Sequence, residues 1–210
     1  MTFGGGLSVA PILAVADFPG YQQVNFQVPW DAGVNPGPVI LSQGPDSTQI
    51  PQFAAPWGQF FTDSEGFVIA QHIPSYGLVT RDDPARPGEW IAAYGSNFGS
   101  VSMPPATGFA APLDRLSSLD SGRDFPWQYS VILQGAGSAS VPVSLSYNFM
   151  GLAPGLVGVY QINFKMPDTA SPPDAQLLIS RARNCGFFFV PGCGRGFQTD
   201  FSTAAKLHVQ

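Results

Sequence analysis

The sequence has little charge, few lysines and no long apolar run, and each shortage excludes a class of protein. Charged residues make up 11% of the 210 residues, against roughly 25% in an average soluble domain. The chain carries only Lys165 and Lys206, and its arginines are scattered. Because no basic stripe could follow a phosphate backbone, nucleic-acid binding is not expected. No apolar run reaches the roughly 20 residues that a membrane-spanning helix needs, so membrane insertion is not expected either.

Helical periodicity is also missing, and strand periodicity is present instead. No segment sustains an apolar stripe with a 3.6-residue period, while 24 glycines and 21 prolines supply many turns. Apolar and polar residues alternate in segments 24–28, 66–72, 88–95, 129–135, 140–149, 160–166 and 204–210. Many short strands between Gly/Pro turns predict an all-β fold, an antiparallel sandwich.

One phrase occurs twice in the chain. Residues 18–30 read FPGYQQVNFQVPW, and residues 151–167 read GLAPGLVGVYQINFKMP. At an offset of 138 residues, from Val24 to Ile162, the glycine, glutamine, asparagine, phenylalanine and terminal proline of the two phrases coincide without gaps. The repeat predicts two related units, each with a half-buried strand that ends at proline. We expect the repeated asparagine to bond to a neighbouring turn.

The repeat divides the chain into a shortened first copy (1–58), a connection (59–74) and a complete copy (75–210). The aromatic residues in or beside the connection are Phe53, Trp57, Phe60, Phe61 and Phe67. Flexible linkers are rich in glycine, serine and charge rather than in aromatic residues. We therefore expect these rings to pack between the copies, and the two copies to unfold in a single transition.

Two stretches resemble known extracellular modules. DPARPGEWIAAYGSNFG (83–99) resembles the opening strand of IPT/TIG immunoglobulin-like modules, in which a Pro-Gly turn leads into a strand that ends in Gly-x-x-Phe-Gly. The phrase at 151–167 resembles an uncharacterised Ig-like C-terminal domain family of large secreted bacterial proteins, in which VNFQVPW closes a first copy. The resemblance implies Ig-like antiparallel β-sandwiches, one complete and one shortened, outside the cell or on its surface. It implies no activity.

The last hairpin departs from that family, because 181–201 is a long insertion that contains both cysteines. Cys185 and Cys193 are separated by seven residues. In a secreted chain, two cysteines in a hairpin-like loop favour a disulfide, which would contribute about 2–3 kcal/mol. Free thiols and a metal site are the alternatives. The metal site lacks ligands, because only His72 and His208 remain as further soft partners.

Two aromatic clusters are the candidates for a binding surface. Trp127 and Tyr129 lie in DFPWQY, and Phe187, Phe188 and Phe189 lie in the insertion. Core packing would explain both clusters. Contact with a partner is the alternative, because tryptophan and tyrosine dominate interface hot spots and the insertion has no evident core of its own.

No motif identifies a catalytic residue, a metal or a cofactor. A Gly-x-Ser-x-Gly elbow is absent from the sequence, and the carboxylates near 63–65 and 82–89 are typical of turns, with calcium binding left open. We expect a non-catalytic structural or adhesive protein whose partner is another protein or a second copy, as in a homo-oligomer or filament. The alternative is a carbohydrate-binding module that binds sugars on Trp and Tyr rings. An enzyme is the third hypothesis.

The first copy also predicts assembly. No counterpart of RPGEWIAAYGSNFG (86–99) precedes its repeated phrase. A sandwich without its opening strands exposes apolar faces and unpaired ladder edges, and an exposed edge is a template for another strand. We expect the missing strands to come from the second copy, from another part of a longer chain, or from a neighbouring subunit by strand addition.

Overall fold

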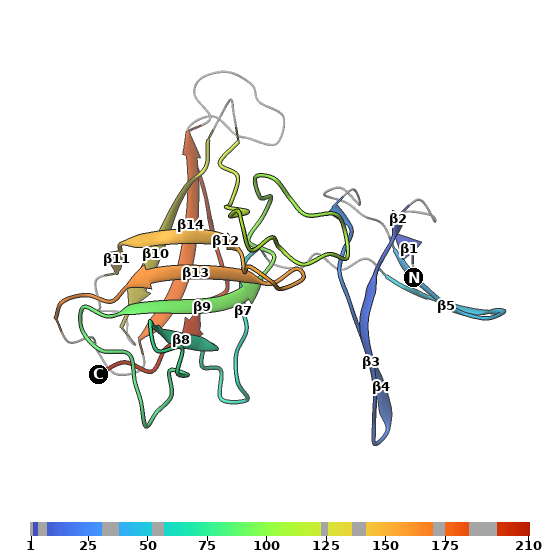
Figure 1. The fold of residues 1–210 in the computed structure, drawn as a ribbon, viewed down its shortest axis with the longest axis horizontal. Coiled ribbons are helices and arrows are strands. Elements are labelled where there is room, and N and C mark those ends of the chain that lie inside the picture. Colours follow the sequence, from blue (N-terminus) through green and yellow to red (C-terminus); the bar gives the residue numbers. More distant parts are fainter. Residues whose placement is uncertain are drawn as a thin grey trace.

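The protein is an all-β molecule. The computed structural model describes residues 2–3, 8–30, 38–51, 57–122, 126–135, 142–169, 175–184 and 197–210. Their strands form antiparallel sheets (Figure 1). Within these ranges there is no helix long and apolar enough to cross a membrane.

Two five-stranded sheets form the complete copy. The first sheet has the order β12 (Tyr147–Leu152), β13 (Tyr160–Lys165) and β9 (Trp90–Ser96), and the other edge of β9 is shared by β7 (Gln59–Phe60) and β8 (Ala70–Ile73). The second sheet has the order β11 (Val143–Leu145), β10 (Gln128–Gln134) and β14 (Gln176–Asn184), followed by β15 (Phe197–Phe201) and β16 (Ala205–Lys206) on one edge of β14. The strands of the two sheets cross each other in Figure 1. This arrangement is that of an Ig-like sandwich and confirms the predicted fold class.

Alternation along β13 explains how the sandwich closes. Tyr160, Ile162 and Phe164 are buried, and the residues between them are half-buried. Phe98, which follows β9, is fully buried, and its ring centre lies 5.4 Å from that of Phe60 and 5.8 Å from that of Tyr160. Val131 of β10 and Ile179 of β14 belong to the same core, and burial of each such side chain contributes about 1.5–3 kcal/mol to holding the two sheets together.

The predicted connection belongs to this sandwich. Strands β7 and β8 lie inside 59–74 and pair with β9, so the complete copy begins near Trp57 rather than at residue 75. Phe60 joins the core of the complete copy. The Phe67 ring stacks on His208, with 3.6 Å between ring centres. The prediction that Phe60 and Phe67 pack between the copies was wrong, because both contact the complete copy.

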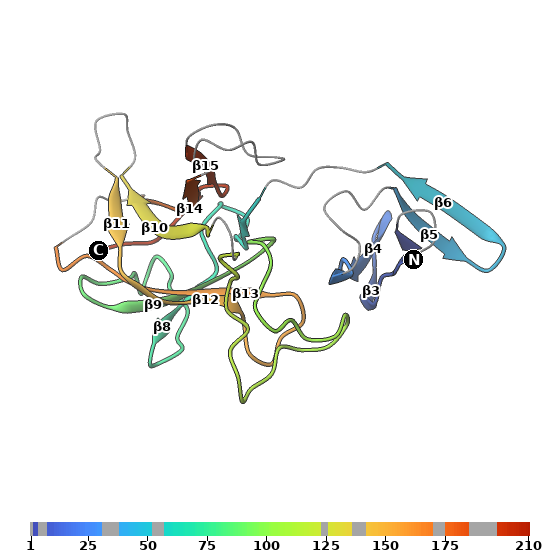
Figure 2. The same ribbon diagram turned by 90° about the horizontal axis from the view of Figure 1, so that it is seen from above.

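The short copy has two pieces. One is a four-stranded sheet in the order β2 (Ser8–Val9), β1 (Thr2–Phe3), β5 (Val39–Gln43) and β6 (Asp46–Ile50), and the other is the hairpin of β3 (Ile12–Phe18) and β4 (Tyr21–Phe26). The β5–β6 hairpin projects away from the complete sandwich (Figure 2).

The topology of the short copy repeats that of the complete copy strand by strand. The order β2-β1-β5-β6 corresponds to β11-β10-β14-β15, and the hairpin β3–β4 corresponds to β12–β13. Val24 pairs with Val15 as Ile162 pairs with Met150. Both hairpins also have a register shift at the same point, between Ile12 and Ala14 in one and between Tyr147 and Phe149 in the other.

Two aligned glycines support the same equivalence. Gly20 and Gly158, which coincide in the sequence repeat, have φ angles of 89° and 68°. This region of backbone conformation suits glycine because it has no Cβ. The sequence repeat is therefore a repeat of backbone structure.

One part of the complete copy has no counterpart in the described residues of the short copy. Among the described residues, the strands β7, β8, β9 and β16 and the connection that follows β9 (97–122 and 126–127) occur once. As a result β13 has a strand on each side, whereas β4 pairs with β3 alone among the described strands.

Candidate functional site

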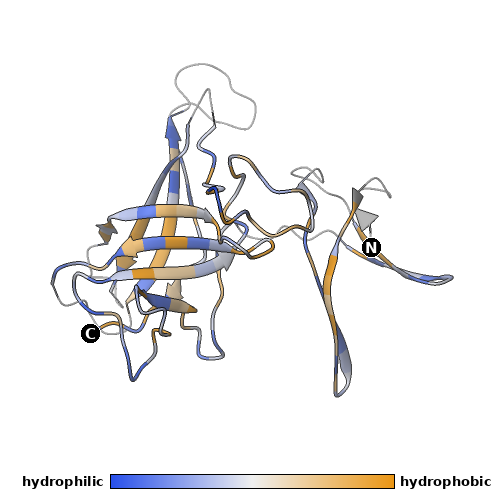
Figure 3. Ribbon diagram, in the orientation of Figure 1, coloured by the Kyte–Doolittle hydropathy of each residue, from blue (hydrophilic) through white to orange (hydrophobic). Residues whose placement is uncertain are grey.

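The hairpin β3–β4 exposes an apolar face that the complete copy buries. Val15 is 63% exposed, whereas Met150 at the equivalent position is 5% exposed. Val24 on β4 is half-buried, whereas Ile162 is 1% exposed. Figure 3 shows apolar stretches along this projecting hairpin. The difference follows from the layer that covers the complete copy, because Met150 and Ile162 belong to a core that includes Ile91 and Ala93 of β9.

Several other large apolar side chains of the short copy are exposed. They are Val9, Ile12, Leu13, Phe18, Tyr21, Val28 and Ile50. The buried apolar cluster of this copy, within the described ranges, consists of Ala10 and Val39 with Phe26 packed against it. Val15 and Val24 are paired neighbours on one face of the hairpin, and adjacent apolar side chains that are not fully buried are a feature of interaction surfaces.

The polar face of β4 also matches that of β13. Gln23 Nε2 donates a hydrogen bond to Asn25 Oδ1 at 2.7 Å, and Gln161 Nε2 donates to Asn163 Oδ1 at 2.8 Å. The repeated asparagine therefore accepts from the glutamine two residues earlier on its own strand, and the expected bond to a turn was wrong. Residues i and i+2 of a strand lie on one face, so the pair forms locally in either copy.

The two copies meet through residues that the sequence did not single out. Gly108 N donates to Gln27 Oε1 at 2.7 Å, and Trp30 N donates to Thr107 Oγ1 at 3.3 Å. Gln27 is buried, although its place after Asn25 on the polar face predicted exposure. Trp30 packs against the core of the complete copy. The periodicity of one strand could not predict these contacts, because the loop of Thr107 and Gly108 lies about 80 residues away in the sequence.

A cluster of arginine and tryptophan lies at one end of the complete sandwich. Arg181 Cζ lies 4.5 Å from the centre of the Trp57 ring and 4.4 Å from that of Trp127. Arg183 Cζ lies 4.4 Å from the centre of the Trp127 ring. Such cation–π contacts stabilise by about 0.5–2 kcal/mol each. Trp127, a predicted binding residue, is therefore packed against two guanidinium groups.

Polar partners hold this cluster in place. Arg181 Nε donates to Asp200 Oδ2 at 2.9 Å, and Arg183 Nη2 donates to Gln198 Oε1 at 2.8 Å. The Tyr129 hydroxyl donates to the Asp120 carbonyl at 3.2 Å, and burial raises the pKa of that hydroxyl. The cluster thus lies where β14 and β15 approach the cysteine-containing insertion.

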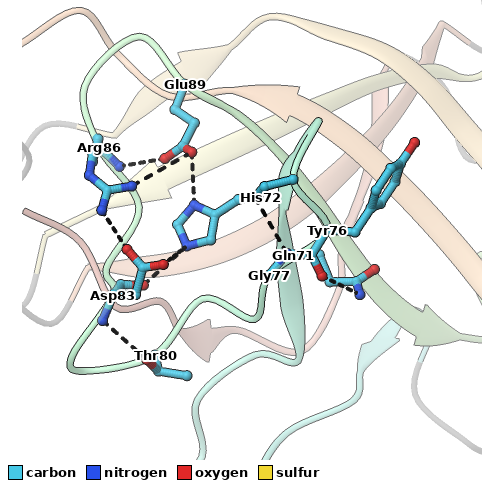
Figure 4. Close-up of polar contacts among 9 residues, drawn as sticks. Gln71, His72, Tyr76, Gly77, Thr80, Asp83, Arg86 and Glu89 are labelled. Carbon is cyan, nitrogen blue, oxygen red and sulfur yellow. Dashed lines mark hydrogen bonds and ion pairs between the residues drawn. The ribbon is translucent and has the colours of Figure 1, made fainter.

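The buried His72 is the centre of a second polar cluster (Figure 4). His72 Nδ1 lies 2.8 Å from Glu89 Oε1, and Nε2 lies 3.1 Å from the Asp83 carbonyl oxygen. Arg86 pairs with the Asp83 carboxylate, and its backbone N donates to Glu89 Oε2 at 3.0 Å. Asp83 N donates to Thr80 Oγ1 at 3.1 Å. Both ring nitrogens face acceptors, so this histidine ties β8 to the turn before β9.

The turn carboxylates are likewise engaged with their own surroundings. Asp63 Oδ1 accepts from the backbone N of Glu65 and of Phe67, each at 2.9 Å. The bond from Phe67 N is the main cause of the lowered pKa of Asp63. Glu65 pairs with Arg81 at 3.1 Å. Within the described ranges, no three His, Cys, Asp or Glu residues are placed to hold a metal ion.

Several predicted residues lie outside the described ranges. They are Cys185, Cys193, Phe187, Phe188, Phe189 and Phe53. The disulfide and the contact role of the insertion therefore stay predictions. Of the other aromatic residues near the connection, Phe61 is exposed, and Trp57 Nε1 donates to the Phe98 carbonyl at 2.9 Å within the complete copy.

Comparison of the chain with protein-family models, with curated proteins and with solved structures finds no match.

Proposed function

We propose that this protein is a non-catalytic Ig-like module of structural or adhesive function, outside the cell or on its surface, that joins polypeptides through its short copy. The observation that carries the proposal is the hairpin β3–β4. It repeats the register of β12–β13, but among the described residues it has neither a second neighbouring strand nor the buried face of that hairpin.

The physical support is the cost of leaving such a surface in water. An unpaired strand edge presents free N–H and C=O groups to other chains, and an exposed apolar face adds hydrophobic attraction. Val15 and Val24 supply that face on adjacent strands. Ladder pairing and apolar burial together are the means by which extended segments add to a sheet.

A carbohydrate-binding role is the second candidate, and its support is the aromatic residues at the end of the sandwich. Trp127 lies beside two guanidinium groups, which compete with a sugar for contact with the ring. A glycan array tests this role. Binding that is lost with Trp127→Ala would favour the second candidate over the first.

An extracellular location is part of the same proposal. It is supported by the resemblance of 83–99 to IPT/TIG modules and by the spacing of Cys185 and Cys193. Intact mass after alkylation without reductant tests the cysteine pairing. Two alkylated thiols in the native protein would contradict it.

Light scattering of the full chain over roughly a hundredfold range of concentration tests the joining role, because association follows mass action. We expect the average mass to rise with concentration, and Val15→Asp to abolish the rise. Leu13→Asp is the matched control. Leu13 lies at the register shift and corresponds to Asn148, which is exposed in the complete copy. A constant monomer mass for wild type and both variants would overturn the role.

A further inference from the structure

We propose that the protein cleaves its own backbone at one peptide bond, the bond between Asp83 and Pro84. This pair is the only Asp-Pro in the sequence, and it lies in the turn between β8 and β9. The reaction goes beyond the joining function and does not depend on it, because the chain acts once on itself and on no other molecule.

An Asp-Pro bond is more labile than other peptide bonds for two chemical reasons. The aspartate carboxylate is tethered beside its own carbonyl carbon, and a tethered nucleophile has a high effective concentration. The leaving nitrogen belongs to a tertiary amide and is released as a secondary amine, which takes up a proton readily. A fold that stabilises the charge formed during the attack would accelerate the cleavage further.

The carbonyl oxygen of Asp83 faces two hydrogen-bond donors. Thr80 N donates to this oxygen at 2.9 Å, and His72 Nε2 lies 3.1 Å from it. A carbonyl oxygen can only accept, so Nε2 carries the hydrogen of this bond. When a nucleophile adds to the carbonyl carbon, negative charge develops on the oxygen. Two donors that are already in place stabilise that charge, as in an oxyanion hole.

Glu89 holds the His72 ring in the orientation that this contact needs. His72 Nδ1 lies 2.8 Å from Glu89 Oε1, and a carboxylate also accepts. The ring form that donates from both nitrogens is the imidazolium. His72 is 3% exposed, so its interaction with the Asp83 carbonyl is weakened little by solvent.

The Asp83 carboxylate is folded back towards its own carbonyl group. Its Oδ2 lies 3.5 Å from His72 Nε2, the same nitrogen that contacts the carbonyl oxygen. Figure 4 shows both oxygens on the side of Asp83 that faces the ring. Arg86 pairs with Oδ1, so Oδ2 is the oxygen that attacks. The Asp83 side chain is 49% exposed, and water can therefore reach the bond.

The fold anchors the chain separately on each side of the bond. Before the bond, Asp83 N donates to Thr80 Oγ1 at 3.1 Å. After it, the buried Ala85 donates from its backbone N to the His208 carbonyl at 3.0 Å. Strand β8 pairs with β9 across the point of cleavage. The fragments 1–83 and 84–210 should therefore stay associated after the reaction.

The reaction is a hydrolysis in two steps. Asp83 Oδ2 attacks the Asp83 carbonyl carbon, the bond from that carbon to the Pro84 nitrogen breaks, and a cyclic anhydride forms. Water then opens the anhydride and leaves two carboxylates on a C-terminal Asp83. One water is consumed in total: its oxygen ends on Asp83, its two hydrogens balance the protons that the proline nitrogen takes up, and no electrons are transferred.

Intact mass under denaturing conditions measures the reaction. The full chain is incubated at mildly acidic pH, because the proline nitrogen must take up a proton, beside the same chain unfolded in urea. We expect fragments 1–83 and 84–210 to appear at least about tenfold faster from the folded chain. Added hydroxylamine should trap the anhydride as a hydroxamate of fragment 1–83, heavier than the acid by one NH group.

Four variants separate the roles of these residues. Asp83→Asn removes the attacking carboxylate and Pro84→Ala removes the secondary-amine leaving group, so each should slow cleavage by about tenfold or more. Asp82→Asn changes the adjacent, exposed carboxylate and is the matched control, which should cleave like the wild type. His72→Leu removes one donor to the carbonyl oxygen and should slow cleavage by about a hundredfold.

Circular dichroism checks that each variant folds. If His72→Leu does not fold, Asp83→Asn and Pro84→Ala still decide, because both positions are only half-buried. The proposal would be overturned by a folded wild type that yields no fragments, or that yields them no faster than the unfolded chain. Cleavage that persists in Asp83→Asn, or that forms no hydroxamate, would overturn it as well.

Discussion

The two copies share a backbone plan and differ in what covers it. In both copies, the hairpin that contains the repeated asparagine has the same strand register and a register shift at the same position. Both hairpins also have the same Gln–Asn hydrogen bond. Among the described strands, a third strand, β9, lies beside that hairpin only in the complete copy. Pairing of neighbouring strands is thus set by local sequence, whereas burial of their faces depends on distant segments. The predictions below test that difference, from the largest expected effect to the smallest.

The largest contrast is between the two equivalent phenylalanines. Phe164 is fully buried, so Phe164→Ala should lower the free energy of unfolding by about 3–5 kcal/mol. Phe26 is half-buried, so Phe26→Ala should cost about 1 kcal/mol, near the average for point mutations. Urea unfolding followed by tryptophan fluorescence measures both. Equal costs would show that the short copy has a closed core.

A second contrast concerns Gly151, which corresponds to Ala16 of the short copy. A Cβ at Gly151 would overlap the Ser117 carbonyl oxygen of the connection that covers β12. The short copy has no such connection among its described residues, and it carries a methyl group at this position. Gly151→Ala should cost about 1–3 kcal/mol or more. Ala16→Gly should cost less than about 1 kcal/mol, and a costly Ala16→Gly would contradict the contrast.

The His72 cluster anchors the strands that only the complete copy possesses. Glu89→Ala would leave His72 Nδ1 and Arg86 N without their acceptor, at a cost of about 1–3 kcal/mol. Glu65→Ala breaks a pair that is exposed on both sides and should cost about 0–1 kcal/mol. Thermal unfolding compares the two, and a neutral Glu89→Ala would show that the cluster is dispensable.

The arginine–tryptophan cluster predicts a smaller effect. Arg181→Lys keeps the charge but loses the planar group that contacts both rings, and it should cost about 1 kcal/mol. Fluorescence quenching by iodide should also increase as Trp57 and Trp127 lose their cover. Lys165→Arg, at an exposed pair with Asp168, is the control and should leave both readouts unchanged.

The smallest effect is a dependence on alkaline pH. Burial raises the pKa of Tyr160 above its ordinary value of 10.0, so the folded state binds the phenol proton more tightly than the unfolded state. That contribution is complete below pH 10 and is lost as the pH rises towards the folded-state pKa. Tyr160→Phe should flatten the decline of stability above about pH 10. An unchanged alkaline slope in urea titrations would contradict the prediction.

Part of the fold was predictable because it depends on neighbours in the sequence. The repeat at an offset of 138 residues identified β4 and β13, and likewise β5 and β14, as equivalent strands. Alternation also identified the buried face of β13. The connection at 59–74 was misassigned because β7 is only two residues long, which is too short for a period to show. The hydrogen bond from Gly108 N to Gln27 could not be predicted either, because the alternation within one strand carries no information about a distant loop.

The candidate site was likewise predictable only in part. An exposed apolar face on the short copy was expected from the absent counterpart of 86–99, and the exposed Val15 agrees with it. The contact of Arg181 with Trp57 and Trp127 was not expected, because these residues come from three separate strands or connections.

By itself the sequence determined the strand alternation, the turn glycines and the duplication, because these depend on residues within a few positions of one another. Only the tertiary structure decided which of two equivalent hairpins is buried. Val15 and Met150 have the same local setting, yet one is exposed and the other enclosed. Burial is a property of the layers that meet, and the layer that covers Met150 comes from strands far from it along the chain.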